Sequence, residues 1–472
     1  MFLGLSRRFW LMLAAVVVVT AGAIALPRVY LVALLGSGYM SQTLCAGLFV
    51  SGRDLDDIMA HEMNSSVLLQ FFQPAIDRET ETVTASAYGI GTQTAIHRDG
   101  LGCTRLDGAD EEALRAQGAG LFPPPAPANR DPEWPAGEGV SAWTPPADVD
   151  GAAVERAIDA IFAELDPAHP RNTRALVVVH GGRIVAERYA PGFDADMPLL
   201  GWSMAKAAIN ALVGLRVKDG ALTLDDDRLM PEWRASDDPR GAITLNELMH
   251  MTSGLAFQEN YDSDLADVAQ MLFVQRNAAG FAASKPLAHK PGTTWSYSSG
   301  TTNIIAGVLR QTFADERDYL RFPRMRLFGP LGMRSAVFEP DAAGTFVGSS
   351  FLYASARDWA RLGLLFLRDG VWLGERLLPA GWLAYSLTPT KLSPEDQYGA
   401  QMWLKLPKSP GLGEPPMPED AYYMVGYNGQ AVAMVPSRDL VVVRLGLTPE
   451  GGDWDNARDL APLVDAFPER PR

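Results

Sequence analysis

The stretch Gly201-Trp202-Ser203-Met204-Ala205-Lys206 decides how the rest of the chain is interpreted. Ser203 and Lys206 are three residues apart, and apolar residues follow at helical spacing as far as Val217, just before Gly220. Both side chains would therefore lie on one face of a helix. Because a serine hydroxyl is a weak nucleophile at neutral pH, it needs a base beside it, and a lysine with a depressed pKa can serve. The pattern is typical of a Ser-Lys acyl-transfer centre.

The same spacing also occurs by chance at the start of an ordinary solvated helix, so the interpretation depends on other stretches. Tyr297 lies in a loop of small residues just before an apolar helix at 304–309, where a phenol could relay protons. A packed core tyrosine is the alternative. Near the C-terminus, Tyr427-Asn428-Gly429-Gln430 enters a strand. A glycine at 429 would let a substrate approach the backbone, and a neighbouring N–H could polarise a carbonyl.

Composition excludes some classes of protein. The chain has 472 residues, of which 47% are hydrophobic and 21% charged, which is a globular composition with room for two or three domains. The formal charge of −15 argues against a nucleic-acid partner, which would require a basic face.

The N-terminus predicts a membrane element. Arg7 and Arg8 precede an uncharged run from Phe9 to Leu26, which is long enough to span a bilayer. Basic residues before the run place the rest of the chain outside the cytoplasm, which is the periplasm in a Gram-negative cell. We favour an uncleaved anchor, whereas small residues at 21–25 would also permit signal cleavage and export. A buried core helix is the third interpretation.

The two cysteines, Cys45 and Cys103, both follow the apolar run. In an oxidising compartment such a pair is expected to form a disulfide. The six histidines show no metal-ligand spacing, so we expect no metal site.

The order of predicted elements indicates an α+β fold. Hairpins are predicted at 82–98, 175–189 and 431–447, and helices at 54–72, 154–165, 205–217 and 456–467. This order predicts an antiparallel sheet that is built from both chain ends and flanked by helices. An all-helical part is expected between the two halves of the sheet. The expected divisions are an anchor or signal at 1–36, a small accessory region at 37–121, a proline-rich connector at 122–147 and the main domain at 148–472.

Three stretches resemble, in order, the three motifs of the serine β-lactamase and penicillin-binding superfamily. They are Ser203-x-x-Lys206, Tyr297-Ser298-Ser299 and Tyr427-Asn428-Gly429. Class C-like esterases and 6-aminohexanoate-dimer hydrolases look most similar. The resemblance implies Ser203 as the nucleophile, Lys206 as its base and Tyr297 as the proton relay to the leaving group. It also implies an oxyanion hole made by the backbone N–H groups of Ser203 and Gln430, substrate contacts from Ser299, Tyr427, Asn428 and Gly429, and no cofactor.

Two departures from the family pattern concern the substrate. Ser299 replaces the usual asparagine of the second motif, and Tyr427 replaces the lysine that helps to hold a β-lactam or D-alanine carboxylate. We therefore expect an esterase or amidase that acts on small neutral substrates through an acyl-enzyme. A penicillin-recognising β-lactamase or D-Ala-D-Ala peptidase is one alternative, and an inactive binding or scaffold protein of the same fold is another.

Overall fold

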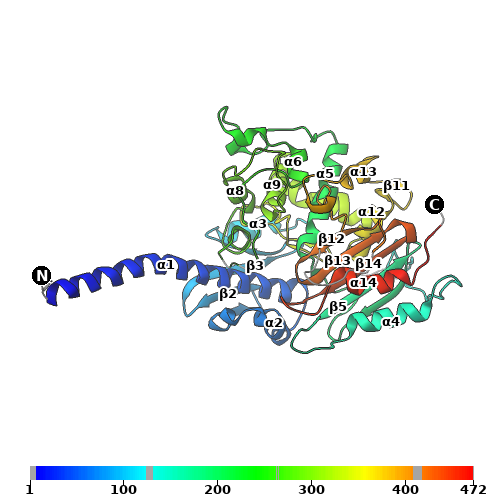
Figure 1. Ribbon diagram of the computed structural model, residues 1–472, viewed down its shortest axis with the longest axis horizontal. Helices are drawn as coiled ribbons and strands as arrows, with labels where there is room; N and C mark the ends of the chain where they lie inside the picture. Colours follow the sequence, from blue (N-terminus) through cyan, green and yellow to red (C-terminus); the bar gives the residue numbers. More distant parts are fainter. Residues whose placement is uncertain (1–6, 124–130, 262, 264, 408–416, 471–472) are drawn as a thin grey trace, which may run out of the picture.

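A five-stranded antiparallel sheet joins the two ends of the main domain. The computed structural model describes residues 7–123, 131–261, 263, 265–407 and 417–470 (Figure 1). The strand order is β12 (Tyr422–Gly426), β13 (Gln430–Val435), β14 (Leu440–Gly446), β5 (Thr173–His180) and β6 (Arg183–Tyr189). The predicted α+β architecture, with a sheet built from chain segments that are far apart in sequence, is confirmed.

Both faces of this sheet are covered by helices. On β5, Leu176 and Val178 face α4 (Gly151–Phe162) and α14 (Asn456–Asp465), whereas the alternating Val177 and Val179 face the core that contains α12 (Ala356–Leu367). Because neither face meets water, the central strands are continuous runs of apolar residues rather than alternating ones.

Helices dominate the segment between the two halves of the sheet. Helix α5, which follows Ser203, spans Ala205–Lys218, and α9 spans Ser299–Gln311 beside it. A capping box formed by Thr244 and Glu247 begins α6. The other helices and short strands are α6 (Leu245–Met249), α7 (Asp267–Phe273), α8 (Ala278–Ala283), α10 (Glu316–Pro323), α11 (Gly329–Leu331), α13 (Trp382–Ser386), β7 (Leu199–Leu200), β8 (Val337–Phe338), β9 (Leu352–Ala354), β10 (Val371–Trp372) and β11 (Glu375–Arg376).

The N-terminal part of the chain forms a second unit around one long helix. Helix α1 is continuous over Arg7–Cys45, and its first half projects away from the molecule (Figure 1). Its second half packs on a four-stranded sheet of β1 (Gln73–Asp77), β2 (Thr82–Ala87), β3 (Ile90–Arg98) and β4 (Gly102–Arg105). Two short helices, α2 (Leu55–His61) and α3 (Glu111–Gly118), complete the unit.

Helix α1 runs through the expected boundary between an anchor and an accessory region. Residue 36, where this boundary is predicted, lies within α1. One window of the described residues, Leu26–Val50, is apolar and long enough to cross a membrane, but two thirds of it is buried inside the protein. The reason is that the C-terminal half of α1 carries its own apolar contacts to the small sheet and is bridged to it by the Cys45–Cys103 disulfide, with 6.0 Å between the Cα atoms.

The proline-rich connector lies partly outside the described residues, which resume at Asp131. Its described part contacts α12, because Arg361 donates hydrogen bonds to the carbonyl oxygens of Pro135 (3.2 Å) and Gly137 (2.6 Å). Trp134 is buried beneath the same guanidinium. The connector is therefore held against the main domain.

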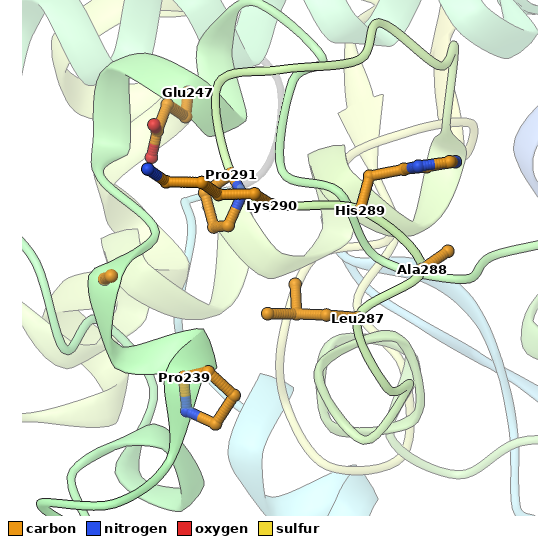
Figure 2. Close-up of a pocket in the computed structure, with 8 residues that line it drawn as sticks. Pro239, Glu247, Leu287, Ala288, His289, Lys290 and Pro291 are labelled. Carbon is orange, nitrogen blue, oxygen red and sulfur yellow. The ribbon is translucent and has the colours of Figure 1, made fainter.

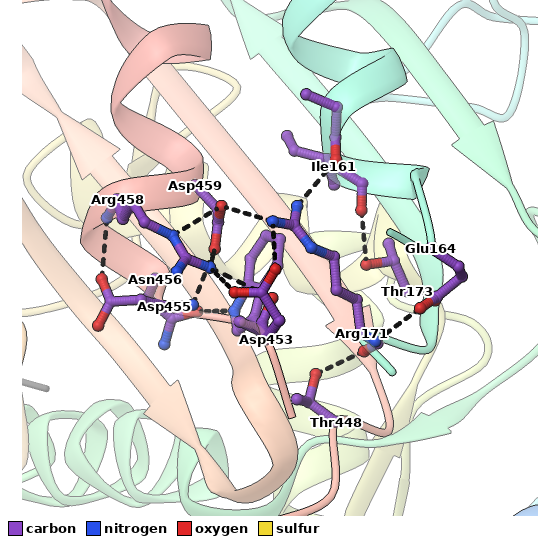
Figure 3. A network of polar contacts seen from close by, with 12 residues as sticks. Ile161, Glu164, Arg171, Thr173, Thr448, Asp453, Asp455, Asn456, Arg458 and Asp459 are labelled. Carbon is purple, nitrogen blue, oxygen red and sulfur yellow. Dashed lines mark hydrogen bonds and ion pairs between the residues drawn. The ribbon is translucent and has the colours of Figure 1, made fainter. Parts of the chain in front are cut away.

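A polar network closes the edge where the chain ends meet (Figure 3). Arg171, just before β5, lies 3.2 Å from Asp453 and 3.3 Å from Asp459, both near the start of α14. Arg458 contacts the same two carboxylates at 2.9 and 2.7 Å. These shared ion pairs tie the first strand of the main domain to its last helix.

Candidate active site

The turn that carries Ser203 is fixed by the packing of two glycines. Strand β7 leads into it and pairs with β9, and the Gly201 N–H donates to the Leu352 carbonyl at 2.9 Å. A Cβ on Gly201 would lie 2.1 Å from the buried ring of Trp359, and one on Gly426 would lie 2.2 Å from the Gly201 oxygen. Strand β12 therefore passes directly against the turn that carries Ser203.

Trp202 holds a conformation that is unusual for a residue with a side chain. Its φ of +48° is in the left-handed region, where non-glycine residues are strained. The next residue, Ser203, is half-buried in a 3-10 turn (Trp202–Met204) that leads directly into α5. Strain of this kind is often found where a backbone must present a reactive side chain.

Lys206 lies one turn further along, within reach of Ser203. Its Nζ is 2.9 Å from Ser203 Oγ, 3.1 Å from Ser299 Oγ and 3.2 Å from the Ser349 carbonyl oxygen. The side chain is buried, and burial lowers the pKa of the amine to about 8, although the charge of Glu259 opposes this shift. With that pKa, roughly one amine in ten is neutral at pH 7. The lysine can therefore act as a base.

Tyr297 completes the group of three side chains. The Lys206 Nζ lies 4.9 Å from the centre of its ring. The Ser203 side chain is near enough to the Tyr297 hydroxyl to oppose the effect of burial on the phenol pKa. The ring packs against Trp403 and Tyr398. Burial raises the pKa of the Tyr297 phenol, so it stays protonated at neutral pH. Of the two candidates, Lys206 is thus the group able to accept the serine proton, and Tyr297 is the group able to donate one.

Ser299 brings a carboxylate into the site that the sequence did not suggest. Its N–H and its hydroxyl donate to the two oxygens of Glu259, at 2.8 and 2.6 Å, while its Oγ also contacts Lys206. Tyr261 donates its hydroxyl to the same carboxylate. No spacing signal identifies Glu259, because it lies 40 residues before Ser299 in a loop between motifs.

The third motif contributes an aromatic rim and a backbone turn. Tyr427 is 43% exposed, stacks on Tyr261 with 5.4 Å between ring centres, and meets the edge of Trp202 at 5.8 Å. The Asn428 amide donates to the Thr448 carbonyl at 2.8 Å, so its side chain stabilises the fold at this turn. Gln430, whose backbone N–H is the expected second oxyanion donor, begins β13 opposite Gly426, which lies against the turn that carries Ser203.

Protein atoms fill the space on the Cβ side of Gly429. A Cβ there would lie 2.6 Å from Arg444 Nη1 and 2.8 Å from the Trp454 ring. Arg444 is fully buried and donates to the carbonyl oxygens of Asn428 (3.1 Å) and Gly429 (3.0 Å). The glycine is therefore required by protein packing, and Arg444 emerges as the residue that holds the third motif in place.

A surface pocket and a group of possible metal ligands are formed by residues other than the predicted site residues. A surface pocket beside α6 is lined by Glu247, His289 and Lys290 among others, and none of the predicted site residues lines it (Figure 2). Within the described residues, one group could offer three metal ligands, namely Glu81, His97 and Asp99 on the small sheet. Of these three residues, His97 and Glu81 are in contact, with 2.6 Å between His97 Nδ1 and the Glu81 carboxylate.

Comparison with known proteins identifies the family and the fold. The beta-lactamase family profile matches residues 158–464. A 6-aminohexanoate-dimer hydrolase from Paenarthrobacter ureafaciens is 23% identical over 303 residues, which cover 59% of this chain and 73% of that protein. A provisionally assigned 6-aminohexanoate-dimer hydrolase from Bacillus anthracis superposes with a TM-score of 0.52 at 21% identity, over 63% of this chain and 81% of that one. A provisionally assigned beta-lactamase from Bacteroides dorei gives 0.50 at 16% identity, over 67% and 96%.

The fold and the profile match define the class. This chain belongs to the beta-lactamase family, and it is a serine hydrolase related to the 6-aminohexanoate-dimer hydrolases.

Proposed function

We propose that the protein hydrolyses small ester or amide substrates through an acyl-enzyme on Ser203. The observation that carries the proposal is the meeting of a hydroxyl, an amine and a phenol: Lys206 Nζ is 2.9 Å from Ser203 Oγ and 4.9 Å from the centre of the Tyr297 ring. Neutral Lys206 takes the Ser203 proton as Oγ attacks the carbonyl carbon. Tyr297 then gives a proton to the leaving alcohol or amine and regains one from protonated Lys206. Water later attacks the acyl group, and its proton passes through the same groups to Ser203 Oγ, which leaves as the hydroxyl.

The oxyanion of each tetrahedral intermediate would be held by the backbone N–H groups of Ser203 and Gln430. Support comes from the close approach of β12 to the Ser203 turn, which puts the start of β13 beside Ser203. The proposed reaction uses water and the groups of the chain itself, with no cofactor.

The surroundings of the site favour a neutral substrate. Tyr427, Tyr261 and Trp202 form an aromatic rim where penicillin-recognising relatives would have a lysine. The nearby Glu259 carboxylate would repel a substrate carboxylate. The relative from Paenarthrobacter ureafaciens is named for an amide substrate, the 6-aminohexanoate dimer, which makes linear amides part of the proposed range.

We place the enzyme at a membrane, with the catalytic domain outside the cytoplasm. The uncharged run from Phe9 to Leu26 belongs to the part of α1 that projects from the molecule, and Arg7 and Arg8 precede it. The Cys45–Cys103 disulfide is consistent with an oxidising compartment such as the periplasm.

Activity-based labelling tests the proposal. A fluorophosphonate probe should label the wild type and not Ser203→Ala, while Ser296→Ala, a matched control at an exposed serine in the Tyr297 loop, should keep full labelling. Lys206→Ala should lower the acylation rate at least about 100-fold, as expected on removal of a positioned base.

A substrate panel separates the alternatives. Faster turnover of short p-nitrophenyl esters and linear amides than of a cephalosporin supports the proposal. Covalent labelling of Ser203 by a fluorescent penicillin, with turnover of D-Ala-D-Ala peptides, would instead indicate a penicillin-recognising enzyme. Inertness toward every probe in a folded protein would indicate a binding or scaffold role.

A further inference from the structure

Five apolar side chains of the N-terminal unit are exposed at one end of its small sheet. Val67, Leu68 and Phe71 lie in a short 3-10 helix (Val67–Phe71) before β1, and Tyr88 and Ile90 lie at the β2–β3 turn. They are 44–77% exposed, and we call these five residues the apolar collar. Their clustering distinguishes them from single exposed apolar residues, which are normal on a soluble surface.

The strand register places both parts of the collar at the same end of the sheet. Gln73, which begins β1 two residues after Phe71, pairs with Ser86, two residues before Tyr88. The opposite end of the same hairpin is the turn at 77–81, which is charged. Neither 63–76 nor 82–96 contains a charged residue, although 21% of the whole chain is charged. The sheet is thus apolar at one end and charged at the other, roughly 20 Å away along β2.

Two contacts show which end of α1 the collar surrounds. At the collar end, Gly91 is so close to α1 that a Cβ would lie 2.8 Å from Ala33 Cβ, and the Phe72 ring presses on Gly36. At the far end, Cys103 is bonded to Cys45. Helix α1 therefore runs along the sheet and leaves it at the collar, close to Tyr30, as the position of β2 beside the projecting helix also shows (Figure 1).

The length of helix beyond the collar matches a bilayer. The uncharged residues 9–26 form 18 residues of continuous helix, or about 27 Å, close to the roughly 30 Å of a hydrocarbon core. Leu26, Val29 and Tyr30, at the exit point, are more than half exposed. If residues 9–26 span the membrane, the collar lies at the level of the lipid headgroups on the exit side.

We propose that the apolar collar inserts into the surface of the phospholipid bilayer that α1 crosses, as a second contact that fixes the catalytic domain at the membrane. This rests on the membrane anchoring included in the proposed function. The protein carries a net charge of −15, so attraction to anionic headgroups cannot supply the contact and apolar burial must. Gly38 and Tyr39 of α1 also pack on Phe273 of α7, so the main domain follows the orientation that the collar imposes.

Site-directed fluorescence tests the proposal on the full chain in phosphatidylcholine vesicles. Ile90→Cys and Phe71→Cys would each be labelled with an environment-sensitive fluorophore, the native cysteines being occupied by their disulfide. Leu373→Cys and Leu165→Cys serve as matched controls, since these leucines are 63% and 74% exposed. Leu373 lies between β10 and β11 and Leu165 follows α4, and both β11 and α4 are drawn on the other side of the molecule from the projecting part of α1 (Figure 1). Lipids with a nitroxide on the acyl chain close to the headgroup act as the quencher.

Because interfacial apolar groups sit about 5–10 Å deep, collar labels should be quenched at least about three-fold more than the controls. Equal quenching at collar and control positions would overturn the proposal. A collar that binds another protein, and not lipid, would remain exposed to water in vesicles that contain only lipid. Failure of the chain to float with the vesicles would also overturn the proposal. Fluorophosphonate labelling of Ser203 in the same samples reports hydrolase function independently, so either idea can fail alone.

Discussion

At the scale of single residues, two opposing effects set the pKa of the Lys206 amine. Burial lowers the pKa of Lys206 to about 8, and the Glu259 carboxylate acts in the opposite direction. The amine must lose its proton before it can accept one from Ser203, whose Oγ is 2.9 Å away. The phenol of Tyr297 has its pKa raised by burial and stays neutral over the same range. The pH dependence of acylation therefore reports on the lysine.

We predict that kcat/KM for ester acylation rises with pH and levels off above an apparent pKa near 8. The direction follows because deprotonation creates the active form of the base. The measurement is the burst or single-turnover rate with a p-nitrophenyl ester, corrected for hydroxide hydrolysis. A profile that falls through this range would exclude Lys206 as the base.

The Glu259→Gln variant isolates the effect of the carboxylate charge. A glutamine keeps the size of the side chain and an oxygen that can accept from Ser299, yet it removes the charge that raises the Lys206 pKa. The apparent pKa of the kcat/KM profile should therefore move to lower pH. Glu247→Gln, a change in the capping box of α6, is a control that should leave the profile in place. A shift to higher pH would show that Glu259 acts in another way.

At the scale of elements, β14 holds the third motif by a single buried side chain. The guanidinium of Arg444 donates to the backbone of Asn428 and Gly429 and stacks 4.2 Å from the Trp454 ring. Gly446, two residues later on the same strand, leaves room for it, since a Cβ there would lie 2.3 Å from the guanidinium carbon. The position of the Gln430 N–H thus depends on a glycine in the neighbouring strand.

Gly446→Ala should disturb this arrangement. Overpacking typically costs about 1–3 kcal/mol, and here the guanidinium is the group that must move. We expect a lower free energy of unfolding in urea together with slower fluorophosphonate labelling of Ser203. Gly451→Ala is the control: its φ is +77° and nothing lies near its missing Cβ, so backbone strain of about 1 kcal/mol should leave labelling unchanged. Equal labelling rates in the two variants would contradict the coupling to the third motif.

Local patterns predicted the elements whose signal lies within a short window. The hairpin at 175–189, the helix after Ser203 and the closing helix are all found, because apolar periodicity and glycine turns are local properties. Strands β7, β8 and β9 went unpredicted, since two or three residues carry no period. Glu259 and Arg444 were missed for a related reason: each acts through partners that are distant in sequence, and no alternation or spacing encodes such a contact.

At the scale of the whole molecule, the N-terminal unit is attached to the main domain through buried polar contacts. The fully buried Glu339 carboxylate, just after β8, accepts from the Gln42 amide of α1 and from the Cys103 N–H, both at 2.7 Å. Burial raises the pKa of Glu339 to about 8. The disulfide partner Cys103 is thus also a docking residue for the catalytic domain.

Removal of the disulfide should weaken the N-terminal unit selectively. The Cys45–Cys103 bridge closes a segment of 58 residues, for which loop entropy predicts a loss of up to about 4 kcal/mol on Cys45→Ser with Cys103→Ser. We expect the small sheet to unfold at lower denaturant concentration, as followed by a fluorophore on a single cysteine introduced in α2, while Ser203 labelling persists to the wild-type midpoint. Simultaneous loss of both signals would show that the two units unfold as one.

The net charge of −15 creates a field that acts on substrates before they reach the site. A negative molecule repels a carboxylate-bearing ester more than a neutral ester of the same size, and Glu259 adds a local repulsion. We predict that the neutral ester has the higher kcat/KM and that the ratio narrows with added salt, since the Debye length falls from about 10 Å at 0.1 M to about 3 Å at 1 M. The preference for the neutral ester that remains at high salt, expressed as the ratio of the two kcat/KM values, measures the contribution of Glu259. The Glu259→Gln variant should show a smaller remaining preference. A preference for the carboxylate ester at low salt would contradict both the field argument and the assignment of a neutral substrate.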